Sequence, residues 1–167
     1  MRYTVGCWMA IPLLTLLGGC VTRTAQDTLE SITPGVSARI PNGLTRVPDY
    51  RGIDSDVARF EGKHGAVSFD RGMYGGTIPP EIGVSASTVI ATGQRLDRSA
   101  ITSGGEYPYG LILLEHVATD PPVVGEPYVP PVYLSISVLC HAAARCKAIA
   151  DTIQSSLSIG ERFPSDL

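Results

Sequence analysis

A strand followed directly by a helix near the end of the chain constrains the fold most strongly. From Val132 to Val138 apolar and polar residues alternate, which is the period of a half-buried strand. From about residue 142 to 157 the apolar residues recur every three or four positions, which predicts a helix with one apolar stripe, formed by Cys146, Ile149, Ala150, Ile153 and Leu157. We therefore predict that this helix packs on the sheet face that carries Leu134 and Ile136.

An apolar run from Val5 to Leu17 follows a short start with one positive charge, Arg2. The run has the length of the hydrophobic core of a secretory signal and is short for a membrane span. It closes with Leu17-Gly18-Gly19-Cys20, which resembles the lipobox of bacterial lipoprotein precursors. The resemblance implies that residues 1–19 are a signal peptide that is removed, and that Cys20 then carries lipid, including acyl chains such as palmitate. The alternative is an ordinary cleaved signal in which Cys20 is incidental.

Lipid on Cys20 would decide where the protein resides. Two or three acyl chains anchor a protein almost irreversibly, because each buried CH₂ contributes about 0.8 kcal/mol. Val21 follows the cysteine. In enteric members of the lipoprotein family an Asp at that position signals retention in the inner membrane. We therefore expect a cell-envelope protein anchored in the outer membrane and facing the periplasm.

The four cysteines of the chain reduce to one pair once the signal is recognised. Cys7 leaves with the signal, Cys20 is the lipid site, and the compartment is oxidising, so Cys140 and Cys146 are expected to form a disulfide. Inside a single helix their spacing would separate them by about 9 Å along the axis. A disulfide requires Cα atoms within roughly 7 Å. Cys140 must therefore end the strand, and the chain must reverse before Cys146. A reduced pair is one alternative. A metal site that includes His141 is another, although it lacks an evident fourth ligand.

Length and composition indicate one small domain. Removing residues 1–19 from the 167-residue chain leaves a single-domain length. Only 17% of residues are charged, and 18 Gly with 13 Pro favour a loop-rich β-containing domain. The net charge of −3, without any basic run, argues against nucleic-acid binding. We assign residues 20–35 to the lipidated cysteine and a flexible tether, and residues 36–167 to one globular domain.

Alternation and turn residues place the other strands. Val36–Ile40 is expected to be a first strand, and residues 57–61 and 66–70 a hairpin whose Gly62 and Gly65 supply positive φ. Further strands are expected at Thr88–Leu96, with Gly93 as a bulge, at Ala100–Thr102 and at Leu111–Val117. These elements predict an α+β fold: a mainly antiparallel sheet of about five to six strands with the C-terminal helix packed on one face.

The closing strand and the segment Ala148-Ile149-Ala150-Asp151-Thr152-Ile153-Gln154-Ser155-Ser156-Leu157 are similar to the ending of PsbP-like domains. In that family a last strand and a helix close an α/β/α sandwich. The resemblance covers about 25 residues. It implies a non-catalytic accessory or binding role without naming a partner.

No sequence motif names a reaction. The chain lacks the GxSxG, GxGxxG, P-loop, HExxH and CxxCH patterns, and we expect no cofactor and no metal. His64 is expected at an exposed turn, His116 as a structural residue beside Glu115, and His141 at the helix start. Asp49, Asp54 and Asp56 lack the Gly and closing Glu of a calcium loop, so we interpret them as a solvated turn.

Tyrosines beside prolines are the remaining candidates for recognition. Tyr107, Tyr109, Tyr128 and Tyr133 would give stiff, amphipathic contact area, which suits a protein partner, or would cap the core. The leading hypothesis is a lipid-anchored envelope protein with a non-catalytic domain that binds another envelope protein. A small-molecule or cell-wall-binding lipoprotein is the alternative, and an envelope hydrolase is third.

Overall fold

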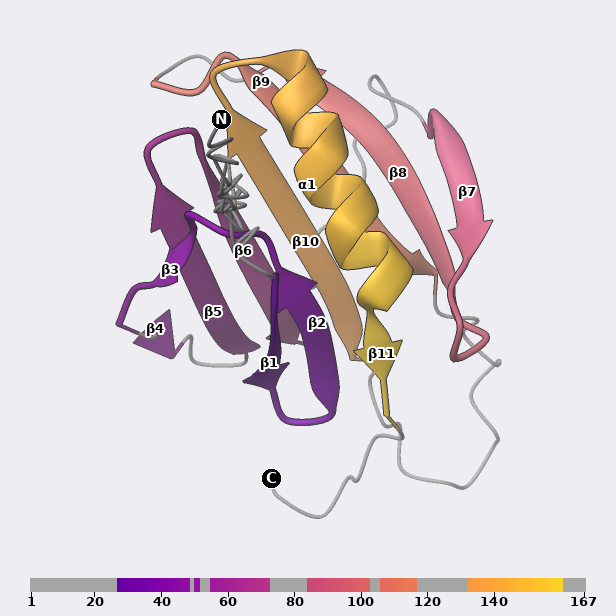
Figure 1. Ribbon diagram of the computed structural model, residues 1–167. Helices are drawn as coiled ribbons and strands as arrows, with labels where there is room; N and C mark the ends of the chain where they lie inside the picture. The colour runs from indigo at the N-terminus through magenta and orange to yellow at the C-terminus, as the bar shows by residue number, and fades with distance from the viewer. Residues whose placement is uncertain are drawn as a thin grey trace, which may run out of the picture.

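The computed structural model describes residues 27–48, 50–51, 55–72, 84–102, 106–116 and 132–160. Within them the chain forms one helix and two antiparallel sheets (Figure 1). The small sheet has the order β1-β2-β11 and consists of β1 Thr28–Thr33, β2 Val36–Ile40 and β11 Ser158–Ile159. The helix, α1, spans Ala143–Ser156.

The large sheet has the order β3-β5-β6-β10-β9-β8-β7, and β4 also pairs with β5. Its strands are β3 Thr45–Arg46, β4 Tyr50–Arg51, β5 Ser55–Gly62, β6 Gly65–Gly72, β7 Ala86–Val89, β8 Arg95–Thr102, β9 Tyr109–His116 and β10 Tyr133–Cys140. The α+β class is confirmed. The predicted strand number was too low, because short edge strands and the whole of β1 carry too little apolar alternation to be recognised.

The helix and the small sheet cover the same face of the large sheet (Figure 1). Between these two layers lies a continuous core of buried side chains. The small sheet contributes Ile32, Val36 and Ile40, while Phe60 and Phe69 of the large sheet meet edge to face with ring centroids 6.0 Å apart. The layers therefore share one core.

The strand–helix prediction at the end of the chain is confirmed. Along β10 every second residue is buried, and the buried set includes Leu134 and Ile136. On α1 the buried residues are Cys146, Ile149, Ala150 and Ile153, and Leu157 follows them into the core. The apolar stripe of the helix thus meets the apolar face of β10.

The β5–β6 hairpin is also confirmed, but the expected role of its glycines is wrong. Neither Gly62 nor Gly65 has positive φ. Both are glycines because other backbone lies where a side chain would be. A Cβ on Gly62 would lie 1.9 Å from the carbonyl O of Gly43, and one on Gly65 would lie 2.6 Å from that of Leu139. Close approach, rather than turn conformation, requires glycine at these two positions.

The expected strand Thr88–Leu96 is wrong. The structure divides it between β7 and β8, which form a hairpin whose turn includes residues 91–93. Gly93 has φ 92°, and its N–H donates to the carbonyl O of Ile90 at 2.9 Å. The glycine therefore forms a bulge, as expected, but the bulge closes a hairpin turn, where Gly93 and Gln94 both lie opposite Ile90, and does not interrupt a single strand. Ala100–Thr102, expected as a separate strand, is the end of β8.

The predicted tether is too long. Residues 28–33, which were assigned to the tether, form β1, and Ile32 lies in the core. β1 pairs with β2, which in turn pairs with β11 after the helix. The N–H of Gly160 donates to the carbonyl O of Gly35 at 2.7 Å. The two ends of the described chain therefore close the domain together. Residues 1–26, including Cys20, lie outside the described residues.

Candidate functional site

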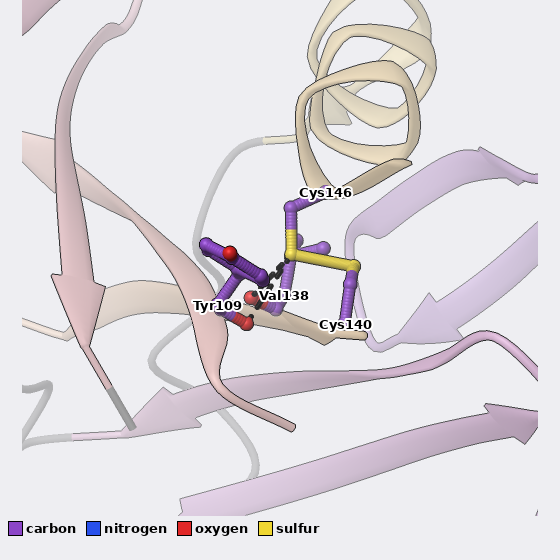
Figure 2. The surroundings of a disulfide bond; sticks show 4 residues. All are labelled: Tyr109, Val138, Cys140 and Cys146. Atoms are coloured by element: carbon purple, nitrogen blue, oxygen red, sulfur yellow. Dashed lines mark hydrogen bonds between the residues drawn. A yellow bond between two sulfur atoms is a disulfide. The ribbon is translucent and has the colours of Figure 1, made fainter. Parts of the chain in front are cut away.

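The two remaining cysteines meet at one end of the large sheet. Cys140 ends β10, residues 141 and 142 reverse the chain, and Cys146 lies on the first turns of α1, so the Cα atoms are 5.5 Å apart and the sulfurs are paired (Figure 2). Both side chains are buried. The reversal between strand and helix is the one the sequence argument requires.

Figure 2 also shows how the disulfide contacts the neighbouring strands. The Sγ atom of Cys146 lies 3.4 Å from the carbonyl O of Tyr109 and 3.7 Å from that of Val138. A bonded sulfur carries no proton, so these are close polar contacts without a thiol donor. The pair therefore ties the start of α1 to β10 and lies against β9.

His141 lies at the start of α1, as expected, directly before the N-cap residue. The N-cap residue is Ala142, which makes no side-chain hydrogen bond. The His141 ring contacts the ring of Tyr107, with centroids 4.8 Å apart and planes inclined by 45°. His64 lies exposed in the β5–β6 turn, as expected. The described part of the chain brings together no group of three or more His, Cys, Asp or Glu residues that could hold a metal ion.

The three candidate tyrosines that the structure describes do not form one surface. Tyr109 is 46% exposed and pairs with Cys140, so it lies at the disulfide beside Tyr107. Tyr133 lies in a strand rather than a loop, at the other end of β10. Seven residue steps of strand separate Tyr133 from Cys140, which corresponds to about 24 Å. Tyr128 lies outside the described residues.

The Glu115 side chain binds the backbone of β10. Its side chain is buried, and its Oε2 accepts a hydrogen bond from the N–H of Leu134 at 3.2 Å. The side chain of His116 and residues Asp49 and Asp54 lie outside the described part, whereas Asp56 lies in β5. The Glu115 carboxylate, next in sequence to His116, therefore makes a structural contact with the backbone of β10.

An exposed edge strand is the feature that sequence reasoning missed. All four residues of β7 are exposed, and Val89 and Val84 are 66% and 52% exposed. No charged residue and no proline occurs between Val84 and Thr92. The signal was present as a run of Ser, Thr, Ala and Val closed by Gly93, but it was interpreted as the first half of one longer strand.

The backbone direction of β7 follows from its turn. The N–H of Ile90 donates to the carbonyl O of Gln94 at 2.9 Å, so Ile90 faces β8. Hydrogen-bonding direction alternates along an antiparallel strand, so Thr88 also faces β8 while the N–H and C=O groups of Ser87 and Val89 point outward. The Ser87 hydroxyl is used by Asp97, to which it donates at 2.6 Å. Among the described strands β7 pairs with β8 alone, so the outward backbone groups of Ser87 and Val89 have no partner strand there.

The other edges in the described structure are short or covered. β3 and β4 have two residues each and are separated by a stretch that contains Pro48. On β1, Arg46 donates to the carbonyl O atoms of Ser31 and Ile32, both at 3.0 Å. Short strands, proline and covering side chains are the usual protections of a sheet edge. Within the described residues, the four-residue β7 is longer than β3 and β4 and contains neither proline nor a charged residue.

A charge cluster joins the helix to the large sheet. Asp151 accepts hydrogen bonds from Lys147 Nζ at 2.6 Å and from Arg98 Nη1 of β8 at 2.8 Å. The hydrogen bond from Lys147, followed by that from Arg98, lowers the pKa of the Asp151 carboxyl below its ordinary value. The cluster offers no unpaired group for catalysis, and we interpret it as support for the position of α1.

Comparison with family models, with curated proteins and with solved structures found no match to this chain. The resemblances of the first 20 residues and of the closing helix therefore stay predictions. None of the helices in the described ranges is both long and apolar enough to cross a membrane.

Proposed function

We propose that this protein is a lipid-anchored component of the bacterial cell envelope whose domain binds another envelope protein through the edge of β7. The single observation that carries the binding role is an exposed, uncharged edge strand in a sheet whose opposite edge is blunted. The lipobox resemblance of Leu17-Gly18-Gly19-Cys20 supports the anchor.

The outward N–H and C=O groups of Ser87 and Val89 can pair with an extended segment of another chain, which adds a strand to the sheet. Natural edge strands usually carry Lys or Pro to prevent such pairing, because an unprotected edge invites aggregation. An open edge with an apolar residue, Val89, therefore suits the binding of a strand from a specific partner protein.

The matched pair Val89→Lys and Val89→Thr tests the edge. Val89 is 66% exposed, so neither change should alter the unfolding midpoint. Lys places a charge where a partner strand would pair, whereas Thr keeps the β-branched shape. After in-cell crosslinking and purification of the lipidated protein, we expect mass spectrometry to recover a stoichiometric envelope protein with wild type and V89T. With V89K we expect about tenfold less, the equivalent of about 1.4 kcal/mol.

Equal recovery of that protein with V89K and V89T would contradict binding through β7. A photo-crosslinking residue in place of Val89 gives a second, independent measurement of where the partner binds. Ser155, on the exposed side of α1, is the control position. We expect the adduct from position 89 and none from position 155. Adducts from position 155 alone would move the partner to the helix face.

The anchor is tested separately by Cys20→Ser. Serine lacks the sulfur that receives the lipid, so the variant should move from the membrane fraction to the soluble envelope fraction. Wild-type protein should stay with membranes after a high-salt wash, because acyl chains anchor independently of salt. If C20S still fractionates with membranes, the lipobox interpretation is wrong.

A further inference from the structure

The described chain begins at the disulfide end of the large sheet. Asp27 Oδ1 accepts a hydrogen bond from the N–H of Asn42 at 3.1 Å. The next residue, Gly43, lies against Gly62, where the β5–β6 turn begins. The point at which the chain enters the domain is therefore next to this turn.

The same end carries the tyrosines and the start of the helix. Register places Gly62, Gly65, Cys140, Tyr109 and Thr102 in one row across β5, β6, β10, β9 and β8. Beyond this row lie the β5–β6 turn, residues 107–108, residues 141–142 and the first turn of α1. We call these segments and the row together the disulfide end. The β1–β2 turn and the β7–β8 turn lie at the opposite end (Figure 1).

The length of chain upstream of Asp27 limits how far this end can lie from lipid on Cys20. Seven residue steps separate Cys20 from Asp27. Fully extended, they reach at most about 25 Å. The large sheet is about as long, because eight-residue β10 corresponds to about 24 Å. The entry point of the domain is therefore held within one domain length of the membrane surface.

We propose that the disulfide end faces the lipid bilayer and that its exposed side chains contact the headgroup layer. This inference rests on the lipid anchor of the proposed function. It gives Tyr107 and Tyr109 a lipid surface as their contact, in place of the protein partner expected from the sequence.

The side chains at this end fit a headgroup layer. Tyr109 is 46% exposed, and Lys63, His64 and His141 are also exposed. Amphipathic rings and lysine stems are favoured at a bilayer interface, because their apolar parts are buried while their polar tips stay hydrated. No acidic residue lies in the first turn of α1 to offset the partial positive charge of the helix start. The charge at this end is mixed, because Glu106 beside Tyr107 and Asp27 at the entry point are also exposed. The fit to the headgroup layer therefore rests on the amphipathic rings and the lysine stem.

This orientation leaves the β7 edge accessible. Val89 pairs with Arg95, which pairs with His116, so Val89 lies in the row farthest from the disulfide end. A partner strand at β7 would approach from the side of the domain and away from the bilayer. Anchor and partner site therefore do not compete for one surface.

The test uses the lipidated full-length mature protein in vesicles of phosphatidylethanolamine and phosphatidylglycerol. Lys63→Cys and Ala91→Cys each place one free thiol on an exposed turn, at the disulfide end and at the opposite end respectively. Each thiol receives a fluorophore, and lipids with a headgroup nitroxide serve as quencher. We expect quenching at position 63 to exceed that at position 91 several-fold.

A spacer of about 20 Gly and Ser residues between Cys20 and Asp27 is the second variant. It should reduce quenching at position 63 toward the value at position 91. Equal quenching at both positions without the spacer, or stronger quenching at 91, would overturn the orientation. Unchanged quenching at 63 with the spacer would overturn the role of the short connection. Recovery of wild-type protein in the soluble fraction would instead overturn the anchor itself, and the β7 pair tests partner binding independently of both.

Discussion

Two glycines of the β5–β6 hairpin, Gly62 and Gly65, are required by close approach of other backbone rather than by turn conformation. The hairpin glycines could be located from the sequence, but their purpose could not, because the group that Gly62 meets is the backbone of Gly43. Long-range contacts of this kind leave no local signal. For the same reason, the sequence did not predict the ring contact between His141 and Tyr107, which are 34 positions apart.

Gly62→Ala is expected to destabilise the domain strongly. Its Cβ would lie 1.9 Å from the Gly43 carbonyl O, so the backbone of one segment must shift. We expect a loss of about 2 kcal/mol or more in the free energy of unfolding, measured by urea denaturation. The matched control is Gly160→Ala, where the nearest atom to the added Cβ is 3.5 Å away and space is sufficient. Similar stability losses in both variants would contradict the close-approach argument.

Asp151→Asn is expected to lower stability by about 0.5 kcal/mol at neutral pH, because the exposed ion pairs are weakened by solvent. The pKa of Asp151 is lowered in the folded state. The contribution of the carboxylate is therefore complete above its unfolded pKa of about 3.9 and is lost as pH falls through the folded pKa. Urea denaturation of both proteins at neutral pH and near pH 2 to 3 measures this difference. A gap that widens on acidification would show that the sign is wrong.

At the scale of elements, periodic segments could be predicted and weakly patterned ones could not. β10 and α1 combine a regular apolar pattern with a buried face, so sequence and structure agree. β7 is exposed along its whole length and has no buried face to create alternation. β1 was missed because only its last residues are buried. The candidate site therefore emerged only in part from the sequence: its cysteines were predictable and its open edge was not.

The disulfide should stabilise the β10–α1 junction through loop closure. In the chain-entropy model a loop this short contributes about 2 kcal/mol. The double variant Cys140→Ala, Cys146→Ala should lose about that amount, with a further cost for the removed buried sulfurs. In urea denaturation, a reducing agent should lower the stability of wild type and leave that of the double variant unchanged. Insensitivity of wild type to reductant, with reduction verified by thiol labelling, would contradict this role.

At the scale of the molecule, both ends of the described chain close one core. The domain carries two distinct surfaces, the disulfide end and the β7 edge. β1 and β11 flank β2, so the N-terminal hairpin and the segment after the helix complete one small sheet. The sequence predicted one α+β domain but not this closure, because β11 has only two residues. The described chain therefore begins at the disulfide end of the domain, and Val89 of β7 lies in the row farthest from that end.

The most direct test of this account is the intact mass of the mature protein purified from membranes. The account predicts a chain that begins at Cys20 and is heavier than the polypeptide by a diacylglycerol and an acyl group. It also predicts that this added mass disappears in C20S. A mature chain that begins at another residue, or one that begins at Cys20 without added lipid mass, would contradict the anchor on which the proposed function and the membrane orientation both depend.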